Sequence, residues 1–238
     1  MPEVSLLEGI ATTRAIRRFR PDPIPEEDLA SILWHATRAP SGSNRQPTRF
    51  VILRDGERAL QAKAILGGAF RDAWNEKRSD DGYEEGSGND PDSPKARMGA
   101  AMQQFVDRFE EIPVVVLACV QHFPYRADTL TTGGGVYPAC QNLLLAARAL
   151  GYGGVMTMWH YLVEDQLREL LEIPDAVPIA ATMALGRPQG RHGPVRRRPL
   201  EQVVYDDKWG DSARWAVDPP GTRFAGGPRI RRPRQDEP

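Results

Sequence analysis

The longest apolar run of this sequence, Val114 to Val120, constrains the fold more than any other feature. Its seven residues follow Pro113 without a polar break and are rich in β-branched valine. A short continuous run of this kind is typical of a strand covered on both faces, because a half-buried strand alternates apolar and polar residues. The run therefore predicts the central strand of a sheet with helices on each side, and it is far too short to cross a bilayer.

Other patterns along the chain predict the surrounding elements. Apolar residues recur at helical spacing in several segments, and short apolar stretches match further strands. Helices are expected over 6–12, 26–36, 56–66, 98–109, 133–150 and 164–171, and further strands over 49–53, 155–158 and 179–185. Helices and strands around one sheet predict the α+β class, with a central mixed sheet flanked by helices.

Length and local composition divide the chain into one domain and an arm. The 238 residues can build one sizeable core, which we place within residues 1–210. Prolines, glycines and arginines are frequent in 211–238, so an extended C-terminal arm is expected there. Residues 71–97 carry many charges and few large apolar side chains, which predicts a mobile excursion. It is either a lid over a pocket or a solvated loop without a task.

Charge and cysteine content limit the partners and the compartment. The 31 basic and 32 acidic side chains give a net charge of -1, so no global field favours nucleic acid. The basic stretch Arg229 to Arg234 leaves a nucleic-acid contact by the tail as a minor alternative. Cys119 and Cys140 lie in apolar runs, as small hydrophobes do, without a disulfide framework. With no leader-like or membrane-spanning pattern, we expect a cytoplasmic protein.

Two polar stretches carry side chains suited to a binding site. In Ala39–Pro47, small hydroxyl and amide side chains lie between two prolines, after one predicted helix and before a strand. In Thr13–Phe19, Arg14 and Arg17 flank a short extended piece, and guanidinium forks suit phosphate and carbonyl oxygens. Together the two stretches predict a site for a planar, anionic cofactor. Turn formation and surface ion pairing remain open alternatives for the same residues.

Other chemistries find little support in the residue pattern. The four histidines are scattered without ligand spacing, and neither cysteine belongs to a cysteine–histidine cluster of the kind that binds zinc, so no metal site is expected. No phosphate-loop pattern occurs. The glycines of Gly151–Gly154 follow a predicted helix instead of opening one after a strand, which argues against a dinucleotide-binding fingerprint.

Five motifs occur in the order in which a known family carries them. They are Arg14–Phe19, Ala39–Pro47, Gln141–Ala147 leading into Gly151–Gly153, Gly186–Pro188, and Arg198–Val204. By these motifs the chain resembles the nitroreductase family of FMN-dependent oxidoreductases over roughly residues 5 to 210. The resemblance implies an intertwined homodimer with FMN sites at the subunit interface, each built from both chains. It also implies NADH or NADPH as hydride donor, docking transiently over the flavin.

The resemblance also implies which residues hold the cofactor. Arg14 and Arg17 would meet the phosphate and the N1/C2-carbonyl side of the flavin, and Met156 and Thr157 would lie over or beside the ring. The hydroxyl and amide residues of Ala39–Pro47 would contact the ribityl chain and ring, some of them from the partner subunit. The full expected set is Arg14, Ala15, Arg17, Pro40, Ser41, Ser43, Asn44, Gln46, Met156, Thr157, Arg196 and Arg198, the last two returning to the phosphate.

The match has departures that bear on the site. Thr13 and Ala15 stand where the family often has a second arginine and a serine, so one phosphate contact is lost or moved to another arginine. Hydride transfer to a flavin needs no protein nucleophile, and no catalytic side chain is expected. A fixed cation beside N1 and the C2 oxygen, expected to be Arg17, would raise the reduction potential. A backbone N–H of the Met156–Thr157 turn would position N5.

The expected activity is reduction of nitroaromatics, quinones or similar conjugated acceptors at one site, by alternating half-reactions with NAD(P)H. Two alternatives remain open. The first is other flavin chemistry of the same fold, namely reductive dehalogenation or oxygen-dependent flavin breakdown, with the excursion as a lid. The second is a protein that binds or stores FMN without turnover.

Overall fold

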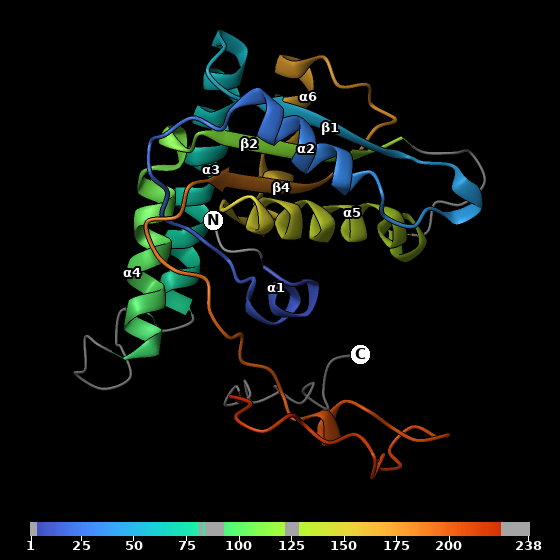
Figure 1. Cartoon of the computed structure of the whole chain (residues 1–238). Helices are drawn as coiled ribbons and strands as arrows, with labels where there is room; N and C mark the ends of the chain where they lie inside the picture. The colour runs from blue at the N-terminus through green and yellow to red at the C-terminus, as the bar shows by residue number, and fades with distance from the viewer. Residues whose placement is uncertain (1–3, 81–82, 84–92, 122–128, 225–238) are drawn as a thin grey trace, which may run out of the picture. The chain divides into compact units, whose positions relative to one another are not determined.

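The computed structural model describes residues 4–80, 83, 93–121 and 129–224, the side chains of 129–132 excepted (Figure 1). The chain forms two units, residues 1–192 and 193–238. The division falls after His192, whereas the sequence had suggested an arm beginning at residue 211.

A four-stranded sheet forms the centre of the first unit. Its strands are β1 (Thr48–Leu53), β2 (Val114–Val120), β3 (Gly153–Thr157) and β4 (Ile179–Gly186), in the order β1-β2-β4-β3. Every residue of β2 is buried, as the apolar run predicted. All three strand pairs are antiparallel, so the expectation of a mixed sheet was wrong. The run predicted burial on both faces, but it carried no information on the direction of neighbouring strands.

Helices cover both faces of this sheet (Figure 1). They are α1 (Leu6–Thr12), α2 (Glu26–Ala36), α3 (Glu57–Asp80), α4 (Pro94–Asp107), α5 (Thr129–Ala149) and α6 (Glu164–Leu171). Val115 and Leu117 of β2 pack with α3, α4 and α6, whereas Val116 and Ala118 pack with α2 and α5. This division follows from the two-residue period of a strand, which sends neighbouring side chains to opposite faces. The α+β prediction is confirmed.

The structure corrects the expected end of the third helix. We expected Gly67 and Gly68 to close it and a mobile excursion to begin at residue 71, but α3 continues to Asp80. Phe70 and Trp74 explain the extension, because both are fully buried in the core that α3 shares with α4. Residues 94–97, also expected in the excursion, form the first turn of α4. Of the remainder, Tyr83 and Ser93 are described, and 81–82 and 84–92 lie outside the described residues.

One edge of the sheet is formed by β1, which pairs only with β2 among the described strands.

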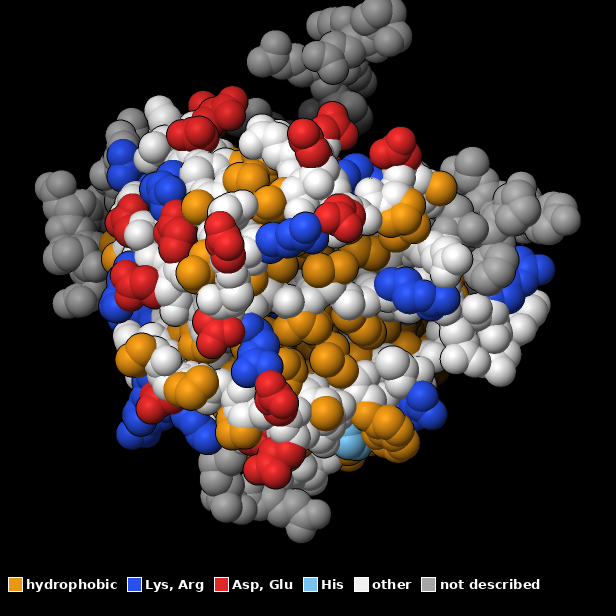
Figure 2. Space-filling model, turned by 90° about the horizontal axis from the view of Figure 1, so that it is seen from above, with side chains coloured by type: hydrophobic (Ala, Val, Ile, Leu, Met, Phe, Trp, Pro, Cys, Tyr) orange, Lys and Arg blue, Asp and Glu red, His pale blue; other side chains and the backbone are white. Residues whose placement is uncertain are grey.

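Seen from above, the molecule shows a band of apolar side chains with charged side chains on both sides (Figure 2). Within the described part of the chain, no helix has the length and apolar character needed to cross a membrane.

The second unit contains little regular structure in its described part, 193–224. A short 3-10 turn covers Leu200–Gln202, and the backbone N–H of Leu200 donates to Asp218 Oδ2 at 3.0 Å. Isolated bridges join Arg197 to Phe224 and Tyr205 to Ser212. Most of its other backbone hydrogen bonds close local turns, and Trp209, Trp215 and Val217 are exposed.

Candidate functional site

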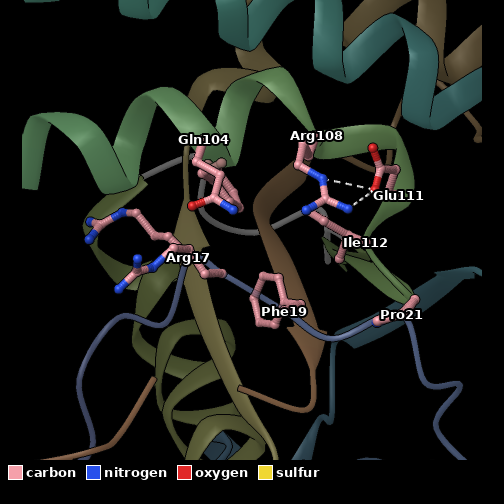
Figure 3. Close-up of a pocket in the computed structure, with 9 residues that line it drawn as sticks. Arg17, Phe19, Pro21, Gln104, Arg108, Glu111 and Ile112 are labelled. Atoms are coloured by element: carbon pink, nitrogen blue, oxygen red, sulfur yellow. Dashed lines mark hydrogen bonds and ion pairs between the residues drawn. The ribbon is translucent and has the colours of Figure 1, made fainter. Parts of the chain in front are cut away.

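Arg17 lies at a small cavity of about 30 Å³ between the N-terminal extended segment and the end of α4. The cavity is lined by Arg17, Arg18, Phe19, Pro21, Gln104, Phe105, Arg108, Glu111 and Ile112. Figure 3 shows the Gln104 side chain hanging from α4 toward the segment that carries Arg17 and Phe19, with Arg108 turned toward Glu111. Arginine and amide groups therefore meet at one place from elements far apart in the sequence.

Arg17 is a partly desolvated cation that has no carboxylate partner among the described residues. Burial lowers the pKa of its guanidinium, and only the phenol of Tyr83 acts in the opposite direction. Its Nε is buried and has no hydrogen-bond partner, and no ion pair to Arg17 occurs among the described residues. By contrast, Arg108 donates from Nε to Glu111 Oε2 at 2.9 Å. Because a buried donor without a partner is costly, Arg17 is suited to a ligand rich in acceptor oxygens.

The segment around Arg17 is held against the sheet like an additional strand. The N–H of Ile16 donates to the carbonyl of Gly154 at 2.9 Å, and the Ile16 side chain is buried. Glycine is needed beside it, since a Cβ on Gly153 would lie 2.6 Å from Ile16 Cγ1. The two glycines that were expected merely to end a helix therefore allow the Arg17 segment to approach β3.

Arg14 does not line the Arg17 cavity. Its Nη2 donates to the carbonyl of Arg191 at 2.7 Å, and its side chain is exposed. Ala15 is exposed as well. Residues three apart in an extended segment point to opposite sides, which explains why Arg14 and Arg17 part. The sequence had grouped them because they are neighbours along the chain.

The stretch Ala39–Pro47 surrounds a second cavity, of about 180 Å³, at the start of β1. Pro40, Ser41 and Gln46 line it together with residues at the end of α2 and the small residues Gly135 and Ala139 of α5. The hydroxyl of Ser41 accepts a hydrogen bond from the Gln46 N–H at 2.7 Å. Ser41 therefore helps to form the turn, which is one of the alternatives that the sequence allowed for these residues.

The backbone of this stretch is strained. Ser43, Asn44 and Gln46 have φ of 52°, 54° and 51°, in the left-handed region that non-glycine residues avoid. The amide of Gln46 donates to Asn44 Oδ1 at 3.0 Å, which helps to hold the turn. Ser43 and Asn44 are exposed. Strain concentrated in one exposed polar turn is typical of a functional site.

The two cavities share no lining residue and belong to opposite ends of the sheet. In Figure 1, α4 lies at one end, and the short turn Gly42–Asn44 lies beyond the start of β1 at the other. A single chain therefore does not bring Ser43 to Arg17. Met156 and Thr157 form the end of β3, where Met156 is exposed and Thr157 half-buried. Arg196 and Arg198 belong to the second unit.

Gln104 and Arg108 were not among the predicted site residues. A helix over this region was expected, and the four-residue spacing of the pair puts both on one helical face. Their neighbour Gln103 points elsewhere, since its Oε1 accepts from Trp74 Nε1 at 2.8 Å and from Arg78. The spacing was visible in the sequence, but the helix face that meets the Arg17 segment was not.

The cysteines play the structural part that their apolar surroundings indicated. Both thiols are buried. Burial raises the pKa of Cys119 to about 11 and that of Cys140 to about 12. Neither thiol is therefore a nucleophile near neutral pH.

Comparisons with known proteins extend these observations. The family model described as "Nitroreductase family" matches residues 10–187. A protein of Thermus thermophilus named NADH dehydrogenase is 31% identical over 206 residues, which cover 86% of this chain and 97% of the relative.

Solved structures share the fold. A putative nitroreductase in complex with FMN from Desulfovibrio desulfuricans aligns with a TM-score of 0.60 at 24% identity, covering 85% of this chain and 96% of its own. The NADPH:FMN oxidoreductase of Vibrio harveyi, complexed with NAD+, aligns with a TM-score of 0.62 at 22% identity, covering 87% of this chain and 79% of its own.

Proposed function

The chain belongs to the nitroreductase family, and from that premise we propose that it is an FMN-dependent oxidoreductase that takes hydride from NAD(P)H. Its acceptors would be nitroaromatics, quinones or similar conjugated compounds, reduced by a ping-pong mechanism at the same site. The observation that carries the proposal is the Nε of Arg17, which is buried without a hydrogen-bond partner among the described residues, at a cavity that Gln104 also lines.

The donors and acceptors at the Arg17 cavity fit the polar edge of a flavin. That edge presents carbonyl oxygens and ring nitrogens, which match the donors of Arg17 and the amide of Gln104, itself both donor and acceptor. Bound FMN would supply the hydride chemistry, accepting and returning a hydride at N5. Arg17 contributes a fixed positive charge with little water around it, so it stabilises negative charge more strongly than an exposed arginine would. Its presence would favour the reduced cofactor.

A second copy of the chain would complete the site. The strained turn that carries Ser41, Ser43, Asn44 and Gln46 lies at the other end of the sheet from Arg17. A two-fold axis can bring two such ends together twice, because a contact of residue i of one copy with residue j of the other is repeated in reverse. In the homodimer we propose, this turn of one chain therefore reaches the Arg17 cavity of its partner.

The surface of α1 and α5 supports dimer formation. Leu6 and Leu7 are 70% and 78% exposed, and Ile10 is exposed as well. Beside them lies a mostly apolar groove of about 370 Å³ lined by residues that include Leu145 and Ala149 of α5. Large apolar side chains gathered on one face of a chain mark an interaction surface.

The phosphate and the ring faces complete the proposed site. Arg14, Arg196 and Arg198 would supply cations for the phosphate, with Arg14 released from the Arg191 carbonyl that it now contacts. Ala15 and Pro40 would make backbone or apolar contacts with the cofactor. The exposed side chain of Met156 and the backbone of Thr157 would lie against the ring, where apolar cover limits access of water.

Purified protein mixed with FMN tests the proposal directly. We expect uptake of about one FMN per chain, bleaching by NADH or NADPH without oxygen, and recovery of the yellow colour when a nitroaromatic or quinone is added. A protein that takes up no FMN at micromolar concentration would refute the proposal. Flavin that is bound but stays yellow with both nicotinamides would instead indicate the storage alternative.

A further inference from the structure

Gln189 lines neither the Arg17 cavity nor the one beside Ser41, yet it contacts the segment that carries Arg17 twice. We propose that Gln189 is a positioning residue, which fixes the orientation of Arg17 and thereby tunes both FMN affinity and the reduction potential of the flavin. The cofactor part of this inference rests on the proposed function. The structural part stands on contacts within the chain alone.

Gln189 binds two successive carbonyl groups of the Arg17 segment. Its backbone N–H donates to the carbonyl of Arg18 at 3.0 Å. Its side-chain Nε2 donates to the carbonyl of Phe19 at 2.7 Å. One residue thus holds the chain immediately after Arg17 through both its main chain and its side chain.

Neighbouring contacts make this attachment a short antiparallel pairing. Phe19 forms a bridge with Pro188, and the N–H of Arg20 donates to the carbonyl of Arg187 at 2.8 Å. The two backbone hydrogen bonds flank the Phe19–Pro188 pair, and the Gln189 side chain adds a third hydrogen bond, to the Phe19 carbonyl. Phe19 also packs closely on Gly186, where a Cβ would lie 3.0 Å from the phenylalanine ring.

Arg17 lies between two anchors of the same segment. On its N-terminal side, the N–H of Ile16 is held by the Gly154 carbonyl at 2.9 Å. On its C-terminal side, Gln189 holds Arg18 and Phe19. The Nε of Arg17 has no partner of its own in the described structure, and the backbone anchors on either side constrain the point from which the side chain extends. Loosening one anchor should therefore displace the charge that the cofactor would meet.

Gln189 permits a clean substitution because its side chain is exposed, and removing it leaves no hole in the core. Gln189→Ala removes the side-chain donor, and Gln189→Glu replaces it with a carboxylate of the same length that cannot donate when ionised. Gln166→Ala is the matched control, since Gln166 is an exposed glutamine on α6. Hydrogen exchange in the FMN-free protein, FMN affinity and flavin potential are measured for each variant.

Both Gln189 variants should exchange faster than wild type at the amides of residues 16–20, and Q166A should not. A net hydrogen bond of about 1 kcal/mol predicts FMN binding weakened about three- to tenfold. If the loss falls mainly on the reduced form, tenfold corresponds to a potential about 30 mV more negative for a two-electron couple. In an Arg17→Gln background, Gln189→Ala should shift the potential no further, because the effect acts through Arg17.

Three results would overturn the inference in distinguishable ways. Unchanged exchange at residues 16–20 in Gln189→Ala would show that the side chain is no anchor. Faster exchange with unaltered FMN affinity and flavin potential would show that Gln189 is a purely structural residue. The same conclusion would follow if Gln189→Ala shifted the potential equally in the wild-type and Arg17→Gln backgrounds. Wild-type protein that binds no FMN would remove the proposed function and the cofactor role together, while the exchange data would still decide the anchor.

Discussion

The hydroxyl of Tyr152 donates a hydrogen bond to Asp28 Oδ2 at 2.6 Å and joins the loop before β3 to α2. The Arg187 guanidinium lies 4.8 Å from the centre of the Tyr152 ring. Tyr152 thus connects both segments that flank the Arg17 strand, because Gly154 and Arg187 each bind that strand through their carbonyls.

Tyr152→Phe should lower the free energy of unfolding by about 1–3 kcal/mol, since a buried hydrogen bond to a carboxylate is lost. Burial, reinforced by Asp28, raises the pKa of the phenol from 10.0 to about 12. The neutral phenol is therefore favoured by folding, and its contribution is complete below pH 10 and lost as pH rises to about 12. Denaturant melts at several pH values check this prediction. The stability gap between wild type and Tyr152→Phe should shrink in that window, and Tyr161→Phe, at an exposed tyrosine, is the control that should change the unfolding free energy little.

Arg17→Gln should weaken FMN binding by about tenfold or more, because a desolvated charged hydrogen-bond donor contributes roughly 1.5–3 kcal/mol. The flavin potential should also become more negative, since the lost cation favours the reduced form. Fluorescence titration and anaerobic redox titration measure the two effects. Arg20→Gln serves as control because Arg20 is exposed and does not line the cavity. Equal effects of the two substitutions would contradict a specific role for Arg17.

Ser41→Ala should destabilise the turn that surrounds the second cavity. The hydroxyl accepts the Gln46 N–H at 2.7 Å, and Gln46 has a positive φ, so this contact helps to hold a strained backbone. We expect a loss of about 1 kcal/mol in unfolding free energy. Ser43→Ala should cost less, because the Ser43 hydroxyl makes no hydrogen bond with any residue that the structure describes. If thermal melts showed a larger loss of stability for Ser43→Ala than for Ser41→Ala, the prediction would be wrong.

Leu7→Glu should shift the chain from dimer to monomer and weaken FMN uptake in parallel. Leu7 is 78% exposed on α1, beside the groove proposed as the contact between copies, and a buried carboxylate there would lack a partner. Sedimentation or light scattering reports the assembly state. Leu60→Glu, at a half-exposed leucine of α3, should leave the assembly unchanged. A Leu7→Glu monomer that binds FMN with wild-type affinity would show that one chain suffices.

Much of the fold was predictable from local patterns. The run Val114–Val120 was recognised as a buried central strand, and the helix Glu164–Leu171 was predicted with its observed bounds. Both succeed because their signals are local, namely continuous apolarity in one case and a helical period in the other. The extension of α3 was missed because Trp74 is an isolated large apolar residue in a polar stretch. It is buried against α4, and that contact is not visible in the local sequence.

The sequence by itself indicated most of the elements and the family, because these rest on residue types in order along the chain, and it singled out Arg17 and the turn around Ser41 as candidate site residues. Only the tertiary structure decided which side chains meet. Gln104 lines the same cavity as Arg17, whereas Gln103 accepts a hydrogen bond from Trp74. Arg14 contacts the carbonyl of Arg191 and lies away from that cavity. The tertiary structure also placed the turn around Ser43 at the far end of the sheet. The physical reason is that the direction of a side chain depends on how helices and strands pack against one another. Packing brings together residues that are far apart along the chain, and their spacing in the sequence does not reveal that contact.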